Sequence, residues 1–296
     1  MPTDITPPLS PERPTAPLLL TLSCPDRIGI VADVASFLVE NGCNIVESAQ
    51  YGDHDNGRFF LRTGFESLSG RTLPELEAAF APIAARHGMD ARFWDASRKT
   101  PTLIMVSRFG HCLNDLLFRW RIGALPIEVK AVVSNHADFR DLVEQAGLPF
   151  HHLPVTPQTK PQQEAALEAL VADLGVELIV LARYMQILSP QMCARQAGRI
   201  INIHHSFLPS FVGARPYHAA HARGVKLIGA TAHYVTEDLD EGPIIEQAVE
   251  RVSHSHSVAD YIAVGRDLEA LVLARAVKWH AEHRVLLNGR RTVIFH

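Results

Sequence analysis

Two short stretches of the chain combine residue types that can transfer an acyl group. The first, Asn202-Ile203-His204, ends an apolar run, and alternation along a strand places Asn202 and His204 on one face. The second is HYVTEDLDEGPII, whose acidic turn contains Asp238 and Asp240. An amide and an imidazole can stabilise charge on an oxygen, and a carboxylate can handle a proton. Together these groups predict acyl-transfer chemistry.

Two alternatives remain open on these residues. Nothing in the turn itself separates Asp238 from Asp240 as the reacting acid. The sequence also has 16 histidines, including the close pair His254 and His256, which raises the question of a metal site. No acidic or cysteine ligand follows these histidines at a recognised spacing, so we expect no metal.

The elements that position both stretches alternate between apolar strands and amphipathic helices. This alternation predicts a doubly wound, mostly parallel sheet within a domain that spans residues 102–296. Ligands of such sheets bind beyond the carboxyl ends of the strands. The expected strands are 102–107, 127–135, 149–154, 177–182 and 199–204, and the expected helices are 111–123, 137–147, 161–175, 190–196 and 258–283.

A second pattern precedes this domain. Residues 18–95 predict the order strand, helix, strand, strand, helix, strand, which is a ferredoxin-like βαββαβ unit of an α/β protein. The polar residues 96–101 are expected to form a linker. The first residues, 1–17, are rich in proline and without periodicity, and they predict a disordered arm.

Composition limits the classes of partner. A length of 296 residues with 47% hydrophobic residues predicts two globular domains, and a net charge of −4 argues against a nucleic-acid partner. No apolar run approaches the ~18 residues of a membrane span, so no membrane partner is expected. The four cysteines form no CxxC pair and no secretory signal is evident, which favours reduced thiols in the cytoplasm.

The motif CPDRIGIVADVASFL, followed by NGCNI, resembles the ACT domain, a regulatory module that pairs with copies of itself and binds amino acids. This resemblance implies a homo-oligomer. It also implies an effector site at Asp26, Gly29 and Asn44, and glycine or methionine is the expected effector because both report on one-carbon supply. The competing interpretation is that Asp26 and Gly29 only cap and turn the chain.

From about Thr102 to the end of HYVTEDLDEGPII, the chain resembles the folate-dependent formyltransferase family. The catalytic trio of that family is an Asn and a His in an N-I-H strand end and an Asp in an H-x-V-x-x-x-x-D turn. Here the trio matches Asn202, His204 and Asp240. The resemblance favours Asp240 over Asp238, and His233 opens the second motif.

Further residues follow from the same resemblance. The stretch LARYMQIL matches the pterin pocket of the family, and His205 beside His204 is a candidate for aiming a water molecule. The folate-binding residues so implied are Met185, Gln186, Ile187 and Leu188. The substrate is then a folate, and no cofactor is expected.

The ACT-like unit and the stretch INIHHSFLPSFVGARPYHAA narrow the resemblance to the family's deformylases. The implied reaction is hydrolysis of 10-formyltetrahydrofolate to formate and tetrahydrofolate, which supplies formate for purine synthesis and balances the one-carbon pool. In this mechanism Asp240 takes a proton from water while Asn202 and a protonated His204 stabilise the oxygen, although Asp240 and His204 can exchange roles.

Two rival functions remain. The first is transfer of the formyl group to an amine. Family members that bind a sugar phosphate have a loop rich in glycine and serine after the first strand of this domain, whereas this chain has SRFGHCL at 107–113, which argues against such an acceptor. The second rival is an amino-acid-sensing regulatory protein with an inactive transferase domain, and the intact trio argues against it.

Overall fold

The computed structural model describes residues 18–207 and 216–296. Their contacts divide the chain into two units between Ser97 and Arg98. The predicted arm at 1–17 lies outside the described residues. The first strand of the second unit begins at Thr100, inside the segment that was predicted to be a linker.

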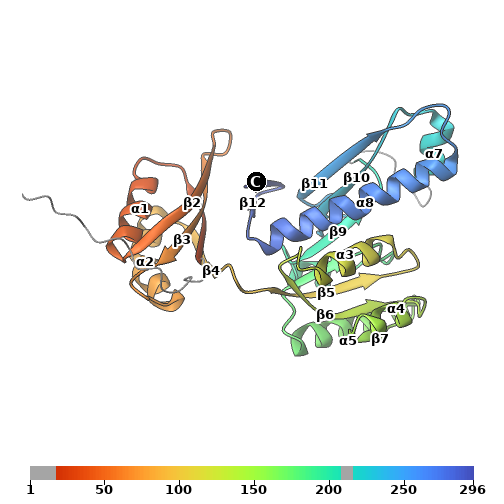
Figure 1. Ribbon diagram of the computed structural model, residues 1–296, viewed down its shortest axis with the longest axis horizontal. Coiled ribbons are helices and arrows are strands. Elements are labelled where there is room, and N and C mark those ends of the chain that lie inside the picture. The colour runs from red at the N-terminus through yellow and green to blue at the C-terminus, as the bar shows by residue number, and fades with distance from the viewer. Residues whose placement is uncertain (1–17, 208–215) are drawn as a thin grey trace, which may run out of the picture. The chain divides into compact units, whose positions relative to one another are not determined.

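The first unit is the predicted ferredoxin-like fold (Figure 1). Its sheet has the order β2-β3-β1-β4, and the β1–β3, β1–β4 and β2–β3 pairs are antiparallel. Alternate residues of β1 and β3, such as Leu20 and Phe65, are buried in one core with Phe37 and Phe80 of the two helices. The elements are β1 (Leu18–Pro25), α1 (Ile30–Glu40), β2 (Cys43–Asp53), β3 (Arg58–Ser67), α2 (Leu73–His87) and β4 (Asp90–Asp95).

The second unit is the predicted doubly wound α/β domain. Seven of its described strands form one sheet in the order β11-β10-β9-β8-β5-β6-β7. The pairs from β7 to β9 are parallel, and β10 and β11 add an antiparallel edge. The strands are β5 (Thr100–Val106), β6 (Ile127–Ser134), β7 (Phe150–His152), β8 (Leu178–Leu181), β9 (Ile200–His204), β10 (Leu227–Tyr234), β11 (Ile244–Arg251), β12 (Val285–Asn288) and β13 (Arg291–Ile294).

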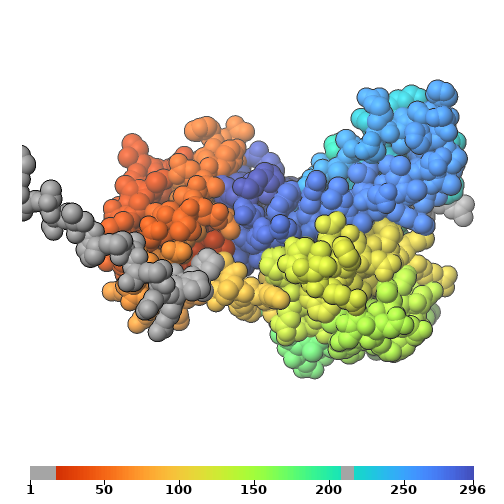
Figure 2. Space-filling view, viewed as in Figure 1, coloured from red at the N-terminus to blue at the C-terminus, as the bar shows by residue number. Residues whose placement is uncertain are grey.

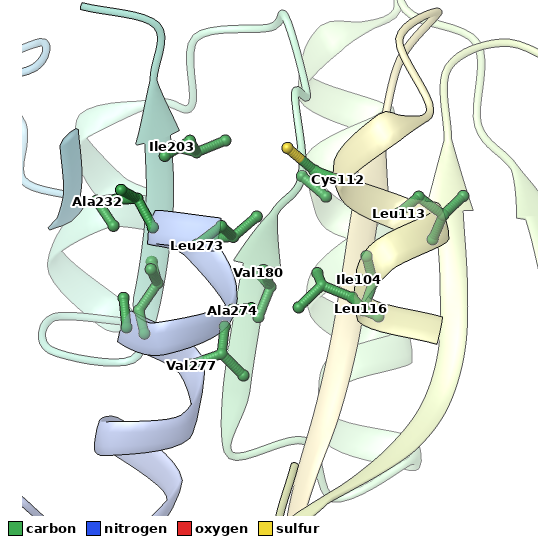
Figure 3. Packing of buried hydrophobic residues seen from close by; sticks show 14 of the residues in the cluster. Ile104, Cys112, Leu113, Leu116, Val180, Ile203, Ala232, Leu273, Ala274 and Val277 are labelled. Carbon is green, nitrogen blue, oxygen red and sulfur yellow. The ribbon is translucent and has the colours of Figure 1, made fainter. Parts of the chain in front are cut away.

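Helices cover both faces of this sheet, because each strand buries apolar side chains on both sides. The helices are α3 (His111–Arg121), α4 (Arg140–Gln145), α5 (Lys160–Asp173), α6 (Pro190–Arg195), α7 (Pro216–Arg223) and α8 (Val258–Ala281). One core joins α3 and α8 to the sheet through residues such as Ile104, Leu116 and Leu273 (Figure 3). A second core lies on the opposite face under α5 and α6. In the space-filling view, α3 and α8 form neighbouring parts of this unit's surface (Figure 2).

Two features were not anticipated from the sequence. Helix α7 begins at Pro216, inside the stretch LPSFVGARPYH, whose prolines and glycine predict a loop. Strands β12 and β13 form a hairpin whose turn contains Asn288 and Gly289, and Gly289 has a φ of 63°. An Asn-Gly pair between apolar residues is a strong hairpin signal. All four cysteines are buried free thiols, and within residues 18–207 and 216–296 no helix is both long and apolar enough to cross a membrane.

Candidate active site

Strands β9 and β10 bring the first predicted residues together. β9 is the last strand of the parallel series, and it pairs with β10 in an antiparallel register that sets Asn202 opposite His233 and His204 opposite Thr231. Directly opposed side chains on one face of a sheet are neighbours. The amide Nδ2 of Asn202 therefore lies 3.3 Å from Nε2 of His233.

Asp240 reaches the same place from the loop between β10 and β11. Its φ of 58° lies in the left-handed region, where aspartate is tolerated better than most residues. The loop folds closely over the end of β10: a Cβ on Gly242 would stand 1.8 Å from the carbonyl oxygen of Tyr234. Only glycine fits at 242, and this close approach sets the position of the Asp240 carboxylate.

The Asp240 carboxylate contacts both histidines. Its Oδ2 lies 3.0 Å from Nδ1 of His204, and its Oδ1 lies 3.5 Å from Nε2 of His233 and from Nδ2 of Asn202. Asp238 has no ion pair among the described residues, and its backbone oxygen accepts a hydrogen bond from Thr236 Oγ1. The geometry therefore connects Asp240, and not Asp238, to the histidines.

The surroundings of Asp240 favour its charged form. Burial raises the pKa of the carboxyl, but the contact with His204 and the nearby His233 ring outweigh burial and hold the pKa well below its ordinary value. The side chain is 23% exposed, so a substrate can still reach it. Asp240 is thus an anion at neutral pH.

Hydrogen bonds also decide which nitrogen of each imidazole faces the cavity. His233 Nδ1 lies 2.9 Å from the carbonyl oxygen of Tyr234, which can only accept, so Nδ1 carries a proton and Nε2 receives the Asn202 amide. His204 directs Nδ1 to Asp240, and its buried Nε2 has no hydrogen-bond partner within the described parts of the chain. That Nε2 atom is available to a ligand.

A cavity of about 320 Å³ collects these groups and the predicted folate residues. Its walls come from the segment after β8, the end of β9, and the β10–β11 loop. All four predicted folate residues, the predicted trio and both supporting histidines line it: Met185, Gln186, Ile187, Leu188, Asn202, His204, Asp240, His205 and His233. Asp238 also lines it.

Side chains from two other elements hold the segment after β8 in place. Ser107, directly after β5, accepts a hydrogen bond from the backbone N–H of Met185 at 2.9 Å. Glu164 of α5 accepts one from the backbone N–H of Ser189 at 2.8 Å, and Gln163 donates to the Tyr184 hydroxyl at 3.2 Å. The backbone of this predicted folate-binding segment is therefore anchored at both ends.

A second ionisable cluster lies beside this cavity, and sequence reasoning missed it. Glu269 of α8 is 1% exposed and contacts His111 Nε2 at 2.8 Å, Arg183 Nε at 3.2 Å and the Tyr217 hydroxyl, which donates at 2.6 Å. Burial raises the Glu269 pKa, but His111, Arg183 and Tyr217 outweigh burial and lower it. The sequence signal that could have revealed this cluster is Glu269 itself, an acidic residue on the apolar side of a long helix.

This cluster includes potential metal ligands. Among the described residues, His111, Cys112 and Glu269 bring ligand atoms within 4.8 Å of one another. Burial, and then the charge of Glu269, raise the pKa of the Cys112 thiol well above its ordinary value, so it stays protonated. A protonated thiol is a poor ligand, and the Arg183 cation already balances Glu269. The donor set therefore does not fit a metal ion.

The predicted effector residues lie in the first unit. Gly29 is the N-cap of α1 with a φ of 98°, and Asp26 lies in the loop just before it. The Asp26 carboxylate is beside Gly52 of β2, because a Cβ there would stand 3.4 Å from Asp26 Oδ2. Asn44 lies at the other end of β2, roughly 27 Å away along the strand. One copy of the unit therefore does not bring Asn44 to Asp26.

Two family models match the chain. Residues 101–277 match the formyl transferase model, and residues 19–81 match the ACT domain model. The two matches fall in the second and first structural units, respectively.

Whole-chain relatives carry both parts. A formyltetrahydrofolate deformylase of Corynebacterium sp. (strain P-1) is 53% identical over 93% of this chain and 97% of its own length. A formyltetrahydrofolate deformylase of Bacillus subtilis (strain 168) is 48% identical over 93% of each chain. The crystal structure of a formyltetrahydrofolate deformylase from Burkholderia mallei ATCC 23344 superposes with a TM-score of 0.92 at 53% identity, covering 95% of this chain and 100% of that one.

Proposed function

The chain belongs to the formyltetrahydrofolate deformylase family and hydrolyses 10-formyltetrahydrofolate to formate and tetrahydrofolate, and we propose that Asn202, His204 and Asp240 carry out the reaction. One observation supports this assignment above the others. His204 contacts Asp240 through Nδ1 at 3.0 Å and keeps a buried Nε2 without a partner, in the cavity that Met185 also lines. An imidazole held in this way can exchange a proton with a bound substrate.

His204 is the proton acceptor in this proposal, and Asp240 is its partner. The pKa of Asp240 is lowered by the two histidines, so its carboxylate is a weak base. Nε2 of His204 takes a proton from water as the water oxygen attacks the formyl carbon. The Asp240 anion stabilises the imidazolium that forms, and that imidazolium returns the proton to N10 of the folate as the C–N bond breaks. Of the two role assignments drawn from the sequence, the lowered pKa favours this one.

Asn202 supplies the amide for the oxyanion. Its Nδ2 has two hydrogens, of which one faces His233 Nε2 at 3.3 Å and the other faces Asp240 Oδ1 at 3.5 Å. A distance of 3.5 Å is long for a hydrogen bond, so the formyl oxygen can replace that contact at little cost. His233 then acts as a positioning residue, because it receives one amide hydrogen and thereby orients the other.

The loop after β5 favours water over a phosphate-bearing amine as the acceptor. Phe109 is 44% exposed there, and the Arg183 guanidinium lies 5.6 Å from its ring centre. A Cβ on Gly110 would stand 2.4 Å from the Phe139 ring, and His111 directs its imidazole to Glu269. Aromatic and charged side chains thus occupy the loop in which backbone N–H groups would have to cradle a phosphate.

One assay tests the reaction. The protein is incubated with 10-formyltetrahydrofolate and no amine, and both formate and tetrahydrofolate are measured. Equal amounts of the two products are expected. Formyl loss only when an amine is added would establish the transferase alternative instead, and no turnover under either condition would favour the regulatory protein with an inactive domain.

The wider role is also a proposal. The formate released would supply purine synthesis in the cytoplasm, and the ACT-like unit would adjust the reaction by binding glycine or methionine. Asp26 and Gly29 lie where the backbone turns into α1, and Gly29 leaves this turn open because nothing lies within 4 Å of a Cβ built on it. A small amino acid is the class of ligand that such a space admits.

A homo-oligomer would complete that site. β2 is an edge strand, and it exposes Ile45, Val46 and Tyr51. An unpaired edge of this kind favours pairing with a second copy. Antiparallel pairing of β2 with itself about its middle brings Asn44 of one copy toward Gly52 of the other, and hence toward Asp26.

Two measurements test this arrangement. Sedimentation at micromolar concentration is expected to show more than one chain of 32.7 kDa per particle, and a single chain would contradict the assembly. Glycine or methionine at millimolar concentration is expected to raise the melting temperature by mass action, and Asn44→Ala should reduce that shift. If no amino acid shifts the melting temperature, the ACT-like unit serves assembly only.

A further inference from the structure

A second cavity, of about 310 Å³, adjoins the first in the catalytic unit. The two cavities share Arg183, Met185 and His205 among their described lining residues. The His205 ring lies 5.0 Å, centre to centre, from the ring of His204. The second cavity therefore begins one residue away from the group that activates water in the proposed function.

The fixed charges around the second cavity are mostly positive. Arg183 and Arg266 line it together with three histidines, and Glu269 is the only acidic side chain among its described lining residues. The Arg183 cation already balances Glu269, and hydrogen bonds from Tyr217 and contact with His111 occupy its oxygens. Arg266 forms no ion pair with another described residue.

Arg266 and His218 are exposed at this cavity, and neither has an ion pair or hydrogen bond with another described residue. An exposed arginine without an ion-pair partner is common on protein surfaces. Here the cavity is also lined by a second, buried arginine, Arg183. Arg183 has a φ of 64°, a conformation that a long side chain rarely adopts, and its buried Nε forms no well-aligned hydrogen bond despite lying 3.2 Å from Glu269. Cations beside low-dielectric walls attract small anions.

Hydrolysis produces one small anion at the junction between the cavities. The formyl carbon is attacked beside His204 and leaves as formate, while tetrahydrofolate still occupies the first cavity. Formate cannot leave through a space that the folate fills. The adjoining cavity offers a route whose cations match its charge.

We propose that the second cavity is a formate chamber, which receives the released formate between Arg183 and Arg266 and passes it to solvent before tetrahydrofolate leaves. The inference rests on the proposed function, since it takes formate from that reaction. It assigns Arg266 a role in binding the product and leaves the bond-breaking step to the trio.

Product inhibition tests the formate chamber. Initial rates of tetrahydrofolate release are measured with added sodium formate and, separately, with sodium chloride at the same ionic strength. Formate is expected to inhibit more than chloride and to lower kcat without competing with 10-formyltetrahydrofolate. Arg266→Gln should weaken the inhibition about fivefold, and Arg266→Glu should weaken it further, because the exposed charge is removed and then reversed.

Arg275→Gln is the matched control, because Arg275 is an exposed arginine of the same helix that does not line the cavity. Its inhibition by formate should equal that of the unmodified chain. Equal inhibition of Arg266→Gln and the unmodified chain, competition between formate and the folate, or no effect beyond that of chloride would each overturn the formate chamber. Inhibition by glycine but not by formate would also overturn it and indicate a site for an amine. Absence of hydrolysis in the unmodified chain would instead contradict the proposed function.

Discussion

Asp240 and Glu269 are both carboxylates beside histidines, and they differ in how their charge is balanced. Asp240 is 23% exposed, lies in a loop and contacts no permanent cation among the described residues, because its partners are two imidazoles and a neutral amide. Glu269 is 1% exposed, lies on a long helix and contacts the permanent cation of Arg183. A partly exposed carboxylate beside imidazoles can take part in proton transfer, whereas a buried one paired with an arginine mainly holds structure.

Tyr217 and Tyr234 link each carboxylate to α8 in different ways. Tyr217 packs against Gly265, where a Cβ would stand 2.1 Å from its ring, and its hydroxyl donates directly to Glu269. Tyr234 acts on Asp240 indirectly: its carbonyl oxygen accepts from His233, and its hydroxyl is hydrogen-bonded to Nδ1 of His280 of α8 at 2.7 Å. The Asp240 side is therefore supported through the backbone, and its carboxylate stays 23% exposed.

The largest expected effect is on turnover and comes from Asp240→Asn. This change keeps the size but removes the anion that holds His204 and stabilises its charged form. Because proton transfer and oxyanion stabilisation are each worth roughly 10²-fold or more, turnover should fall at least ~10³-fold. Steady-state and single-turnover rates measure this loss, and tetrahydrofolate affinity should survive because residues 185–188 are unchanged.

Asp238→Asn is the control for that experiment, since Asp238 lines the same cavity without contacting either histidine. It should lower turnover much less. An inactive Asp238→Asn beside a nearly normal Asp240→Asn would show that the assignment within the turn is wrong.

Glu269→Gln should mainly lower the free energy of unfolding. The change leaves the Arg183 cation buried without its counter-charge, and removal of one partner from a buried ion pair costs about 3 kcal/mol of unfolding free energy. Urea unfolding measures this loss. Asp267→Asn on the exposed side of the same helix should change the unfolding free energy by less than about 0.5 kcal/mol. Equal losses in the two variants would remove the distinction between Glu269 and an ordinary surface acid.

The smallest expected effect is a pH-dependent change in the free energy of unfolding that comes from His280. Burial, and then the charges of His283 and Arg199, lower the His280 pKa to about 4. In the unfolded chain the ordinary histidine value applies, about 6.5, so between these values the unfolded state binds the extra proton. The contribution of His280 to the free energy of unfolding is therefore fully present above pH ~6.5 and declines toward pH ~4, with a loss of about 2 kcal/mol by pH 5.

His280→Gln keeps a hydrogen-bonding group for the Tyr234 hydroxyl and removes the titration. Unfolding free energies of this variant and the unmodified chain, measured by urea titration from pH 7 to pH 5, should differ in slope by about one proton. Parallel slopes would mean that His280 is not the partly buried, neutral group that contacts Tyr234 of β10.

Much of the fold and of the candidate site could be predicted from local pattern. Alternating apolar strands and helices predicted the order of both units, because hydrophobic periodicity is set by each element's own geometry, and that prediction is confirmed. The N-I-H strand end and the turn motif are short, so Asn202, His204 and Asp240 could be selected from the sequence. Their roles in the reaction stay predictions.

Only the tertiary structure decided which partners each charge meets. His111 and Glu269 are 158 positions apart, and neither has a neighbour in sequence that signals the other. The family pattern already favoured Asp240 over Asp238, but the contact between Asp240 and His204 depends on a left-handed residue and on the approach of Gly242 to Tyr234. Sequence periodicity reports which face of an element is buried, but contacts between elements follow from how the sheet and its helices pack, and that packing places one carboxylate beside His204 and the other beside Arg183.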